Sequence, residues 1–126
     1  MPLVTITVLR PKAAEFKRSI LDAVHEALVD IGVPTADLFQ RVLELSPEDF
    51  RFDPSYPDVQ GKRTDGFVLI EVLLSVGRSV KVKRQFLRVL VERLTRAGHS
   101  AENVMVVFKE TAWENWAFAG GRQIHI

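Results

Sequence analysis

The sequence predicts an α+β (α/β) fold in which two β-α-β units form a four-stranded sheet with both helices on one face. One observation behind this prediction is the order of hydrophobic periods, which runs strand, helix, strand, loop, strand, helix, strand. The other is an internal repeat, because a constant shift of 66 residues carries apolar positions of the first half onto apolar positions of the second. Examples are Val4 and Ile70, Val24 and Leu90, and Val42 and Phe108. We therefore expect one domain over residues 1–126, with repeats at about 2–45 and 67–108 and a C-terminal tail.

The first repeat opens with a strand and a helix. Residues 2–9 alternate with period 2, and Pro2 costs no ladder hydrogen bond at the head of a strand. Residues 12–30 form the expected helix, whose apolar stripe consists of Phe16, Ile20, Val24, Ala27 and Ile31. Gly32 suits a left-handed cap at the end of this helix, and Pro34 prevents its continuation.

The rest of the chain is expected to hold four more regular elements and one long loop. They are a strand at 38–45, the loop at 46–66, a strand at 67–75, a helix at 79–97 that Gly98 ends, and a strand at 103–108. Within each unit the two strands are expected to be parallel, with a right-handed crossover. The last two strands are apolar on both faces although helices cover only one, so we expect the bare face to pack against other copies in an obligate homo-oligomer.

Composition narrows the classes of protein to consider. Hydrophobic residues make up 47% of the chain and charged residues 26%, as in ordinary globular domains. A net charge of +1 predicts neither a nucleic-acid nor a membrane partner, and no apolar run has the length of a membrane span. Since cysteine is absent and no leader-like segment precedes the first strand, we expect a cytoplasmic protein. The histidines, His25, His99 and His125, lack metal-ligand spacing, so no metal site is expected.

Pro2 raises a chemical question. While Met1 precedes it, its nitrogen is an amide, which is neither a base nor a nucleophile. If Met1 is removed, the nitrogen becomes a secondary amine, and burial or nearby cations favour the neutral form of such an amine. A neutral amine can move a proton from a carbon beside a carbonyl group, which is tautomerisation. The structural alternative is that Pro2 simply begins a strand.

Two charged residues stand at the ends of predicted elements. Arg78 lies where the third strand ends and the second helix begins, a place where a cation opposes the helix dipole. Its guanidinium and the peptide N–H groups of the helix start would together suit a carboxylate, although a solvated arginine beside a Ser79 cap is the structural alternative. Asp37 precedes the second strand, and an Asp after Pro-Thr is most often a turn former.

The chain resembles the tautomerase superfamily, and within it the malonate semialdehyde decarboxylase group and its tautomerase-like relatives. The resemblance covers nearly the whole chain and rests on PLV at the start, GVPTADLFQRV after the first helix, GRS after the third strand and ENWAFAGGR near the end. It implies removal of Met1, a homotrimer, and an active site in which Pro2 is the catalytic amine. It also implies that Arg78 binds the substrate carboxylate and that Asp37 is an acid/base partner.

Four further residues are candidate substrate contacts. Gln40 matches a family position, and it either bonds to substrate or only sits on the sheet. Trp116 and Phe118 share a face in an extended segment, where they form either an oligomer interface or the apolar wall of the pocket. Arg122 follows two glycines and is either a second anion contact or part of an ordinary turn.

We therefore expect a cofactor-independent tautomerase, a keto-enol isomerase acting on a small 2-oxo or enol carboxylic acid with Pro2 as general base. The expected partners are this small carboxylate and further copies of the chain. The decarboxylases of the family carry Arg-Pro-Arg where this chain has Val76, Gly77 and Arg78, so the first cation is missing. A decarboxylase or hydratase of a small 3-oxo or unsaturated acid is therefore the alternative, and a non-catalytic trimeric binding protein is another.

Overall fold

The computed structural model describes residues 1–123 and contains every strand and helix that the sequence predicts, with ends displaced by a few residues. The elements are β1 (Leu3–Leu9), α1 (Ala14–Asp30), β2 (Gln40–Leu45), β3 (Val68–Ser75), α2 (Val80–Arg96) and β4 (Val104–Thr111). Two short 3₁₀ helices, Ala101–Asn103 and Trp113–Asn115, flank β4. The fold prediction is thus confirmed.

The sheet has the order β2-β1-β3-β4, and its register repeats between the two units. Strands β1 and β2 are parallel, strands β3 and β4 are parallel, and β1 and β3 join the units in an antiparallel pair. Val4 lies opposite Gln40 in the first unit, and Val68 lies opposite Val104 in the second, with the same spacing. Thr5 pairs with Glu71, its own counterpart under the shift of 66 residues. The two units are therefore related by an approximate two-fold axis that passes between these two residues.

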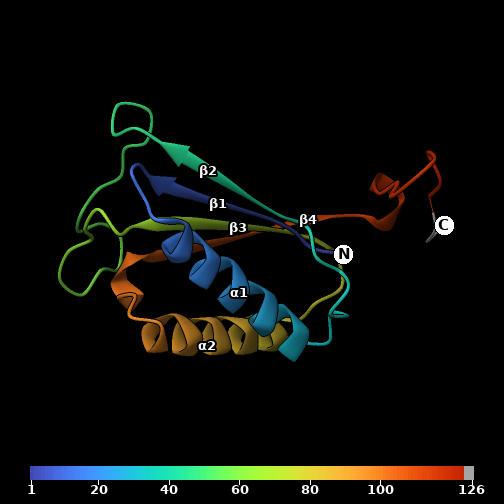
Figure 1. Ribbon diagram of the computed structural model, residues 1–126. Coiled ribbons are helices and arrows are strands. Elements are labelled where there is room, and N and C mark those ends of the chain that lie inside the picture. Colours follow the sequence, from blue (N-terminus) through green and yellow to red (C-terminus); the bar gives the residue numbers. More distant parts are fainter. Residues whose placement is uncertain (124–126) are drawn as a thin grey trace.

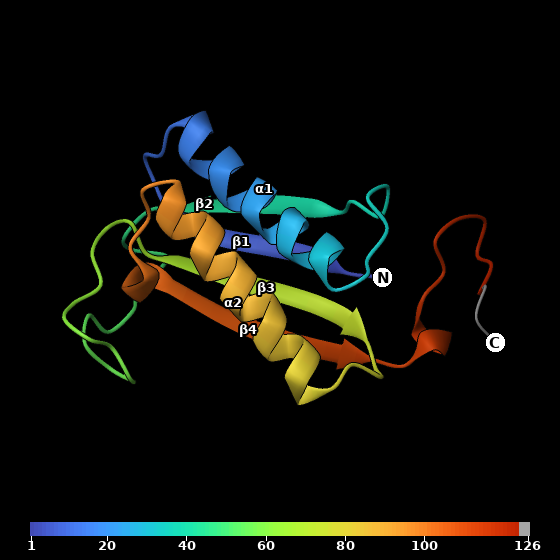
Figure 2. The same cartoon turned by 90° about the horizontal axis from the view of Figure 1, so that it is seen from below.

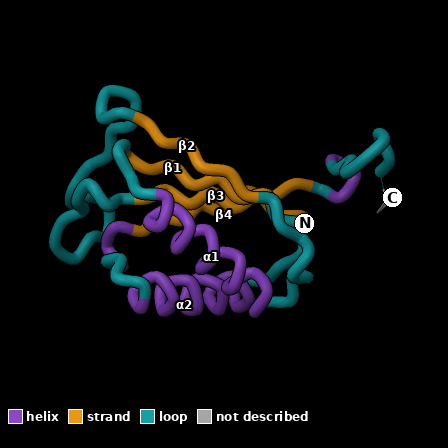
Figure 3. Tube along the Cα trace, in the orientation of Figure 1, coloured by secondary structure: helices purple, strands orange, loops and turns teal. Residues whose placement is uncertain are grey.

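The core lies between the sheet and the helices, which cross one face of the sheet side by side (Figures 1, 2 and 3). Each helix contributes three fully buried residues at equivalent repeat positions: Ile20, Val24 and Leu28 from α1, and Phe86, Leu90 and Leu94 from α2. Alternate residues of β1 and β3 meet them, because successive side chains of a strand point to opposite faces. Both repeats thus supply one shared core.

Both helices end in the same backbone motif. Gly32 has a φ of +103°, its N–H donates to Val29 O at 3.0 Å, and the next N–H donates to Leu28 O. Gly98 has a φ of +96° and repeats the pattern, because its N–H donates to Thr95 O and the following N–H to Leu94 O. These are Schellman motifs, and their positive φ is the reason that glycine stands at both positions.

The other face of the sheet has no helix from residues 1–123 over it, as Figure 1 shows. This face mixes apolar and charged side chains. Leu43 and Met105, on the two edge strands, are 42% and 40% exposed. Between them lie the Lys109–Glu71 ion pair at 2.8 Å and a hydrogen bond from Arg41 Nε to the Thr5 hydroxyl. No helix within the described residues has both the length and the apolar character to span a membrane.

The two ends of the sheet carry different segments. Met1 and the segment 112–123 lie at one end, where that segment projects beyond β4 (Figures 1 and 2). The long loop at 46–66 lies at the opposite end. The arrangement places the start of the chain beside its C-terminal aromatic residues.

Candidate active site

A cavity of about 220 Å³ lies at the start of β1. We call it the N-terminal cavity, and its lining residues are Met1, Pro2, Leu3, Phe39, Trp116, Ala117 and Phe118. Pro2 is buried immediately before the strand, and the first ladder contact beyond it is the Val4 N–H, which donates to Phe39 O at 2.9 Å. The strand therefore holds the Pro2 ring in place without needing a hydrogen bond from its nitrogen.

Two stacked aromatic rings form one wall of the N-terminal cavity. Trp116 and Phe118 have ring centroids 5.5 Å apart and planes inclined by 23°. The short helix Trp113–Asn115 precedes them, and it ends as Trp116 N–H donates to Trp113 O at 3.2 Å. The indole Nε1 of Trp116 is buried and has no hydrogen-bond partner within residues 1–123. This wall therefore offers one unused donor in otherwise apolar surroundings.

Asp37 lies in the turn between α1 and β2. Its backbone N–H donates to Pro34 O at 3.0 Å, so the residue takes part in the turn that the sequence suggested. Its side chain does more than form this turn, because Oδ1 is buried and lacks a hydrogen-bond partner in the described part of the chain. A buried carboxylate oxygen without a donor is costly in a folded protein and marks a place where a donor from outside can bind.

Arg78 follows β3 after Gly77, whose φ of +122° turns the chain toward α2. The half-buried side chain of Arg78 has no hydrogen bond or ion pair among residues 1–123. Ser79 caps the helix by accepting a hydrogen bond from Val82 N–H at 3.2 Å. The helix is therefore capped without help from Arg78, and the guanidinium remains available for an anion.

Electrostatics link these residues to the start of the chain. Burial lowers the pKa of the N-terminal amine, the Asp37 carboxylate raises it, and the Arg78 guanidinium lowers it, with a net decrease. The amine belongs to Met1, which precedes Pro2. The structure thus brings the first residues, Asp37 and Arg78 into one electrostatic neighbourhood although they are far apart in the sequence.

The structure does not bring Gln40 and Arg122 to the N-terminal cavity. The side-chain amide of Gln40 donates to Leu21 O at 2.8 Å and so ties the start of β2 to helix α1. Arg122 is exposed in a turn, where its N–H donates to Ala119 O and its guanidinium lies against Gly120. Contact of either residue with substrate stays a prediction.

Sequence reasoning missed Phe39, which lines the N-terminal cavity and is 50% exposed. A signal was available, because Phe39 stands two residues after Asp37 at the entry to a strand, where alternate residues share a face. Val76, two residues before Arg78, is 47% exposed and adds an apolar surface there. Among residues 1–123 no three His, Cys, Asp or Glu side chains are grouped so as to hold a metal, and His125 lies outside the described residues.

Comparisons with known proteins agree with one another. A family model described as "Tautomerase enzyme" matches residues 37–119. The probable tautomerase YusQ of Bacillus subtilis (strain 168) is 27% identical over 124 residues, which are 97% of this chain and 96% of that protein.

Solved structures with similar folds include enzymes of the same kind. Malonate semialdehyde decarboxylase inhibited by 3-bromopropiolate is similar with a TM-score of 0.87 and 28% identity, covering 96% of this chain and 92% of that one. A second malonate semialdehyde decarboxylase structure, described as a basis for decarboxylase and hydratase activities, has a TM-score of 0.86 and 29% identity over 96% and 93% of the two chains. A fused 4-OT symmetric trimer, 22% identical over 96% and 94%, has a TM-score of 0.70 and shows likeness of fold.

Proposed function

Because the chain belongs to the tautomerase family, we propose that it is a cofactor-independent tautomerase that converts a small enol carboxylic acid to its 2-oxo form. The observation that carries the proposal is the N-terminal cavity, where the first two residues meet an aromatic wall and the charges of Asp37 and Arg78 act on the amine. Removal of Met1 is part of the proposal, since it converts the Pro2 nitrogen from an amide to an amine.

The proposed reaction moves one proton. The neutral Pro2 nitrogen accepts the proton of the enol hydroxyl group as the carbon–oxygen double bond forms. The electron pair of the carbon–carbon double bond takes up a proton at the neighbouring carbon, and protonated Pro2 returns the proton there. The amine is regenerated, no group is lost or gained overall, and no cofactor is needed.

The surrounding residues have separate roles in this proposal. Arg78 anchors the substrate carboxylate, because a planar guanidinium without another partner can bind both carboxylate oxygens. The Asp37 carboxylate, whose Oδ1 is buried without a partner among residues 1–123, stabilises the Pro2 ammonium that forms when the amine takes up the enol proton. Trp116 and Phe118 exclude water from the reacting atoms, which keeps the amine pKa low.

A decarboxylase or hydratase acting on a small 3-oxo or unsaturated acid is the second candidate. It is favoured by the likeness to malonate semialdehyde decarboxylase over nearly the whole chain. In that reaction cationic Pro2 would polarise a carbonyl group. The apolar Val76 beside Arg78 weighs against this candidate, because it removes a second cation from the carboxylate end.

We also propose a homotrimer. The uncovered face of the sheet supports it, since exposed Leu43 and Met105 lie on a surface that no described helix covers. The segment 112–123 supports it further, because its backbone extends beyond the end of β4 and away from the sheet (Figure 1). A structural neighbour, the fused 4-OT, is described as a symmetric trimer.

The decisive experiment measures ketonisation of phenylenolpyruvate by three forms of the protein. Protein whose intact mass shows that Met1 is absent is expected to be active, and Arg78→Ala is expected to lower kcat/KM about 100-fold or more, as loss of a charge-assisted anion contact does. A form with a stable Gly-Ser extension ahead of Pro2 is expected to be inactive, because its Pro2 nitrogen stays an amide.

The outcomes separate the candidate functions. Pro2→Ala keeps an N-terminal amine but loses the ring, so it is expected to retain a small fraction of activity while the extended form has none. Full activity of the extended form would end the proposed mechanism. Turnover of malonate semialdehyde in place of enol acids would establish the decarboxylase, and inactivity on enol, 3-oxo and unsaturated acids would leave a binding protein.

A further inference from the structure

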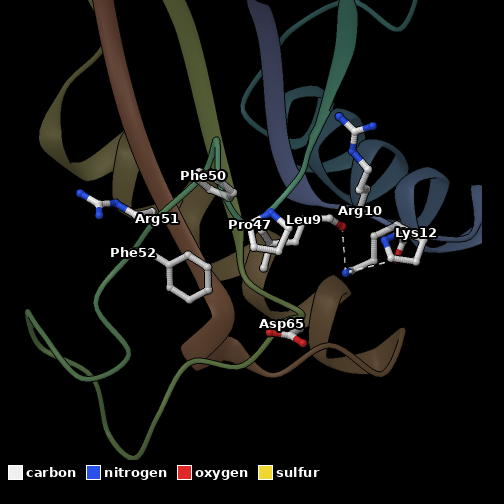
Figure 4. A pocket seen from close by; sticks show the side chains of 9 residues that line it. Leu9, Arg10, Lys12, Pro47, Phe50, Arg51, Phe52 and Asp65 are labelled. Carbon is white, nitrogen blue, oxygen red and sulfur yellow. Dashed lines mark hydrogen bonds between the residues drawn. The ribbon is translucent and has the colours of Figure 1, made fainter.

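A second cavity of about 490 Å³ lies at the opposite end of the sheet, beside the long loop. We call it the loop-end cavity, and Figure 4 shows its lining side chains. Its apolar side is formed by Phe50 and Phe52. Both rings rest on the buried Phe67, with centroids 5.7 Å and 4.3 Å from it. The cavity is therefore built on the core of the domain and not on the loop alone.

The internal repeat relates the two cavities. Phe50, Arg51 and Phe52 stand 66 residues before Trp116, Ala117 and Phe118, the aromatic wall of the N-terminal cavity. The same shift takes Lys12 to Arg78 and Arg10 to Val76. The approximate two-fold axis between Thr5 and Glu71 exchanges the two ends of the sheet, so the aromatic wall of one cavity corresponds to the aromatic wall of the other.

The loop-end cavity lacks the groups for proton transfer. The counterpart of Pro2 is Val68, whose nitrogen lies inside the chain and is an amide. The counterpart of Asp37 is Asn103, whose side chain is occupied by two hydrogen bonds with Thr64, at 2.8 Å and 2.9 Å. Chemistry of the kind proposed for the N-terminal cavity is therefore absent here.

The loop-end cavity has more cationic side chains than the equivalent positions of the other repeat, where only Arg78 is charged. The Lys12 ammonium points toward the middle of the cavity and donates to Leu9 O at 2.9 Å (Figure 4). Arg10 and Arg51 are exposed, point outward on either side of the opening, and have no ion-pair partner among residues 1–123. Asp65 is the single carboxylate of the lining, and nearby Glu44 is neutralised by Lys17 at 2.7 Å. The lining therefore carries a net positive charge beside aromatic rings.

We propose that the loop-end cavity is a second, non-catalytic binding site for a small organic carboxylate with an aromatic or apolar body. The carboxylate binds Lys12 in the place that the repeat assigns to Arg78. The Lys12 ammonium donates only to the neutral carbonyl oxygens of Leu9 and Pro11, so it has no counter-ion among residues 1–123. The apolar body lies against Phe50 and Phe52, as an apolar ligand does in an aromatic-lined pocket. Arg10 and Arg51 add positive charge at the rim, which attracts the anion.

The test is a titration of ¹⁵N-labelled protein with phenylacetate, followed by the amide signals of the two cavities. Signals of Lys12 and residues 50–52 are expected to shift as one saturable set, and those of Leu3 and Phe39 as another. Lys12→Met keeps the apolar stem and removes the charge, so it is expected to weaken binding at the loop end about tenfold and leave the N-terminal cavity unchanged. Arg78→Ala is expected to do the reverse.

Two further variants make the test specific. Asp65→Asn removes the single carboxylate of the lining and is expected to tighten phenylacetate binding, because the net positive charge rises. If Lys12 only supported the local structure and charge did not matter, Asp65→Asn would not tighten binding. Lys62→Met, an exposed loop cation outside the lining, is expected to change nothing. The double variant Arg10→Val/Arg51→Ala, which has the residues found at these positions in the other repeat, is expected to bind phenylacetate more weakly. Its binding is also expected to depend less on salt concentration.

Two control ligands test whether binding at the loop-end cavity needs both the carboxylate and the apolar body. 2-Phenylethanol, which has the same body without the carboxylate, is expected not to bind, and inorganic phosphate is expected to bind far more weakly than phenylacetate. Equal binding of either compound, or phenylacetate shifts confined to the N-terminal cavity, would refute the proposal. The readout is binding and not turnover, so these results stand apart from the outcome of the enzyme assay.

Discussion

The N-terminal amine is the group on which the proposed proton transfer depends. An α-amine in water has a pKa of about 8. With Met1 in place, burial lowers the pKa of the Met1 amine, the Asp37 carboxylate raises it and the Arg78 guanidinium lowers it, and we expect the Pro2 amine to experience the same charges. A lower pKa keeps the amine neutral over more of the physiological range, and the neutral form is the one that accepts a proton.

In protein that begins at Pro2, we expect Arg78→Ala to raise the amine pKa and Asp37→Asn to lower it. The reason is that the first change removes a cation and the second an anion from the surroundings of the amine. An NMR titration of ¹³C- and ¹⁵N-labelled proline at position 2 measures both shifts. The limb of kcat/KM that reports the base should move to higher pH in the first variant and to lower pH in the second.

A matched control is Lys81→Ala, which removes an exposed cation from the first turn of α2. It is expected to leave the Pro2 titration midpoint where it is, because Lys81 does not act on the amine. If the Arg78 and Asp37 variants shifted the midpoint in the same direction, the electrostatic account of the site would be wrong.

The family resemblance grouped three of the candidate site residues, and the ends of the elements explain why the structure brings them near one another. Pro2 begins a strand, Asp37 precedes the parallel strand beside it, and Arg78 follows the antiparallel neighbour, so all three reach one end of the sheet. Gln40 shows the limit of this reasoning. Its position on β2 was predictable, but its bond to Leu21 O depends on how α1 lies against the sheet, which periodicity does not report.

At the scale of elements, the repeat is most visible where the helices end. Both Schellman motifs place a glycine with positive φ immediately after the C-cap. The buried residue after Gly32 is Val33, whereas the residue after Gly98 is His99. The two ends therefore share a backbone conformation and differ in the side chain that covers it.

We expect Gly32→Ala and Gly98→Ala each to lower the free energy of unfolding by about 1–2 kcal/mol, the cost of a Cβ in the left-handed region. No heavy atom lies within 4 Å of a Cβ added at either position, so backbone strain and not a clash is the cause. Urea denaturation followed by circular dichroism measures the change. Gly32→Asn should cost less, because Asn tolerates this conformation, and an equal cost for Asn and Ala would contradict the explanation.

His99 joins the two helices and predicts a pH dependence of stability. Its Nε2 lies 2.7 Å from the Ser19 hydroxyl, its ring meets Phe16 edge-on, and burial lowers its pKa from the ordinary value near 6.5. Below that value the unfolded chain binds more protons than the folded one, so the free energy of unfolding falls as the pH drops from about 6.5 through the folded pKa. Denaturation midpoints across this range should show the fall, and His99→Gln should remove it; an unchanged profile in that variant would assign the effect to another group.

The elements themselves could be predicted because period, glycine caps and the repeat all agree. Their exact ends could not, since β4 continues to Thr111 through Lys109 and Glu110, polar residues that break the apolar run. Their strand conformation comes from pairing with β3, where Glu110 lies opposite Leu74 and Lys109 opposite Leu73. Such pairing depends on a strand that is distant in the sequence, so the local pattern of apolar and polar residues does not predict it.

At the scale of the whole molecule, the uncovered sheet face predicts the assembly. We expect the protein to sediment at three times the mass of one chain, and Leu43→Asp with Met105→Asp to give monomers at micromolar concentration. Both side chains are about two-fifths exposed on the face without helices, and a carboxylate enclosed in an interface there would be strongly destabilising. Sedimentation velocity measures the species present.

Val29→Asp provides the comparison for this experiment. Val29 is an apolar residue of similar exposure, 36%, but it lies on helix α1 and not on the bare face. It is expected to leave the sedimenting mass unchanged. A monomeric wild-type protein, or equal dissociation by Val29→Asp, would show that the bare face is not where the copies meet.

The pairing of Thr5 with its own counterpart Glu71 sets two like halves around one axis, yet the ribosome starts a polypeptide only once. A chain with two repeats in tandem therefore has a terminal nitrogen at one end of the sheet and only peptide nitrogens at the other. Selection for proton transfer can therefore act on residues at the first end, whereas residues at the other end can change without affecting that reaction. The two ends of the sheet are thus alike in backbone fold but differ in the chemistry available to them.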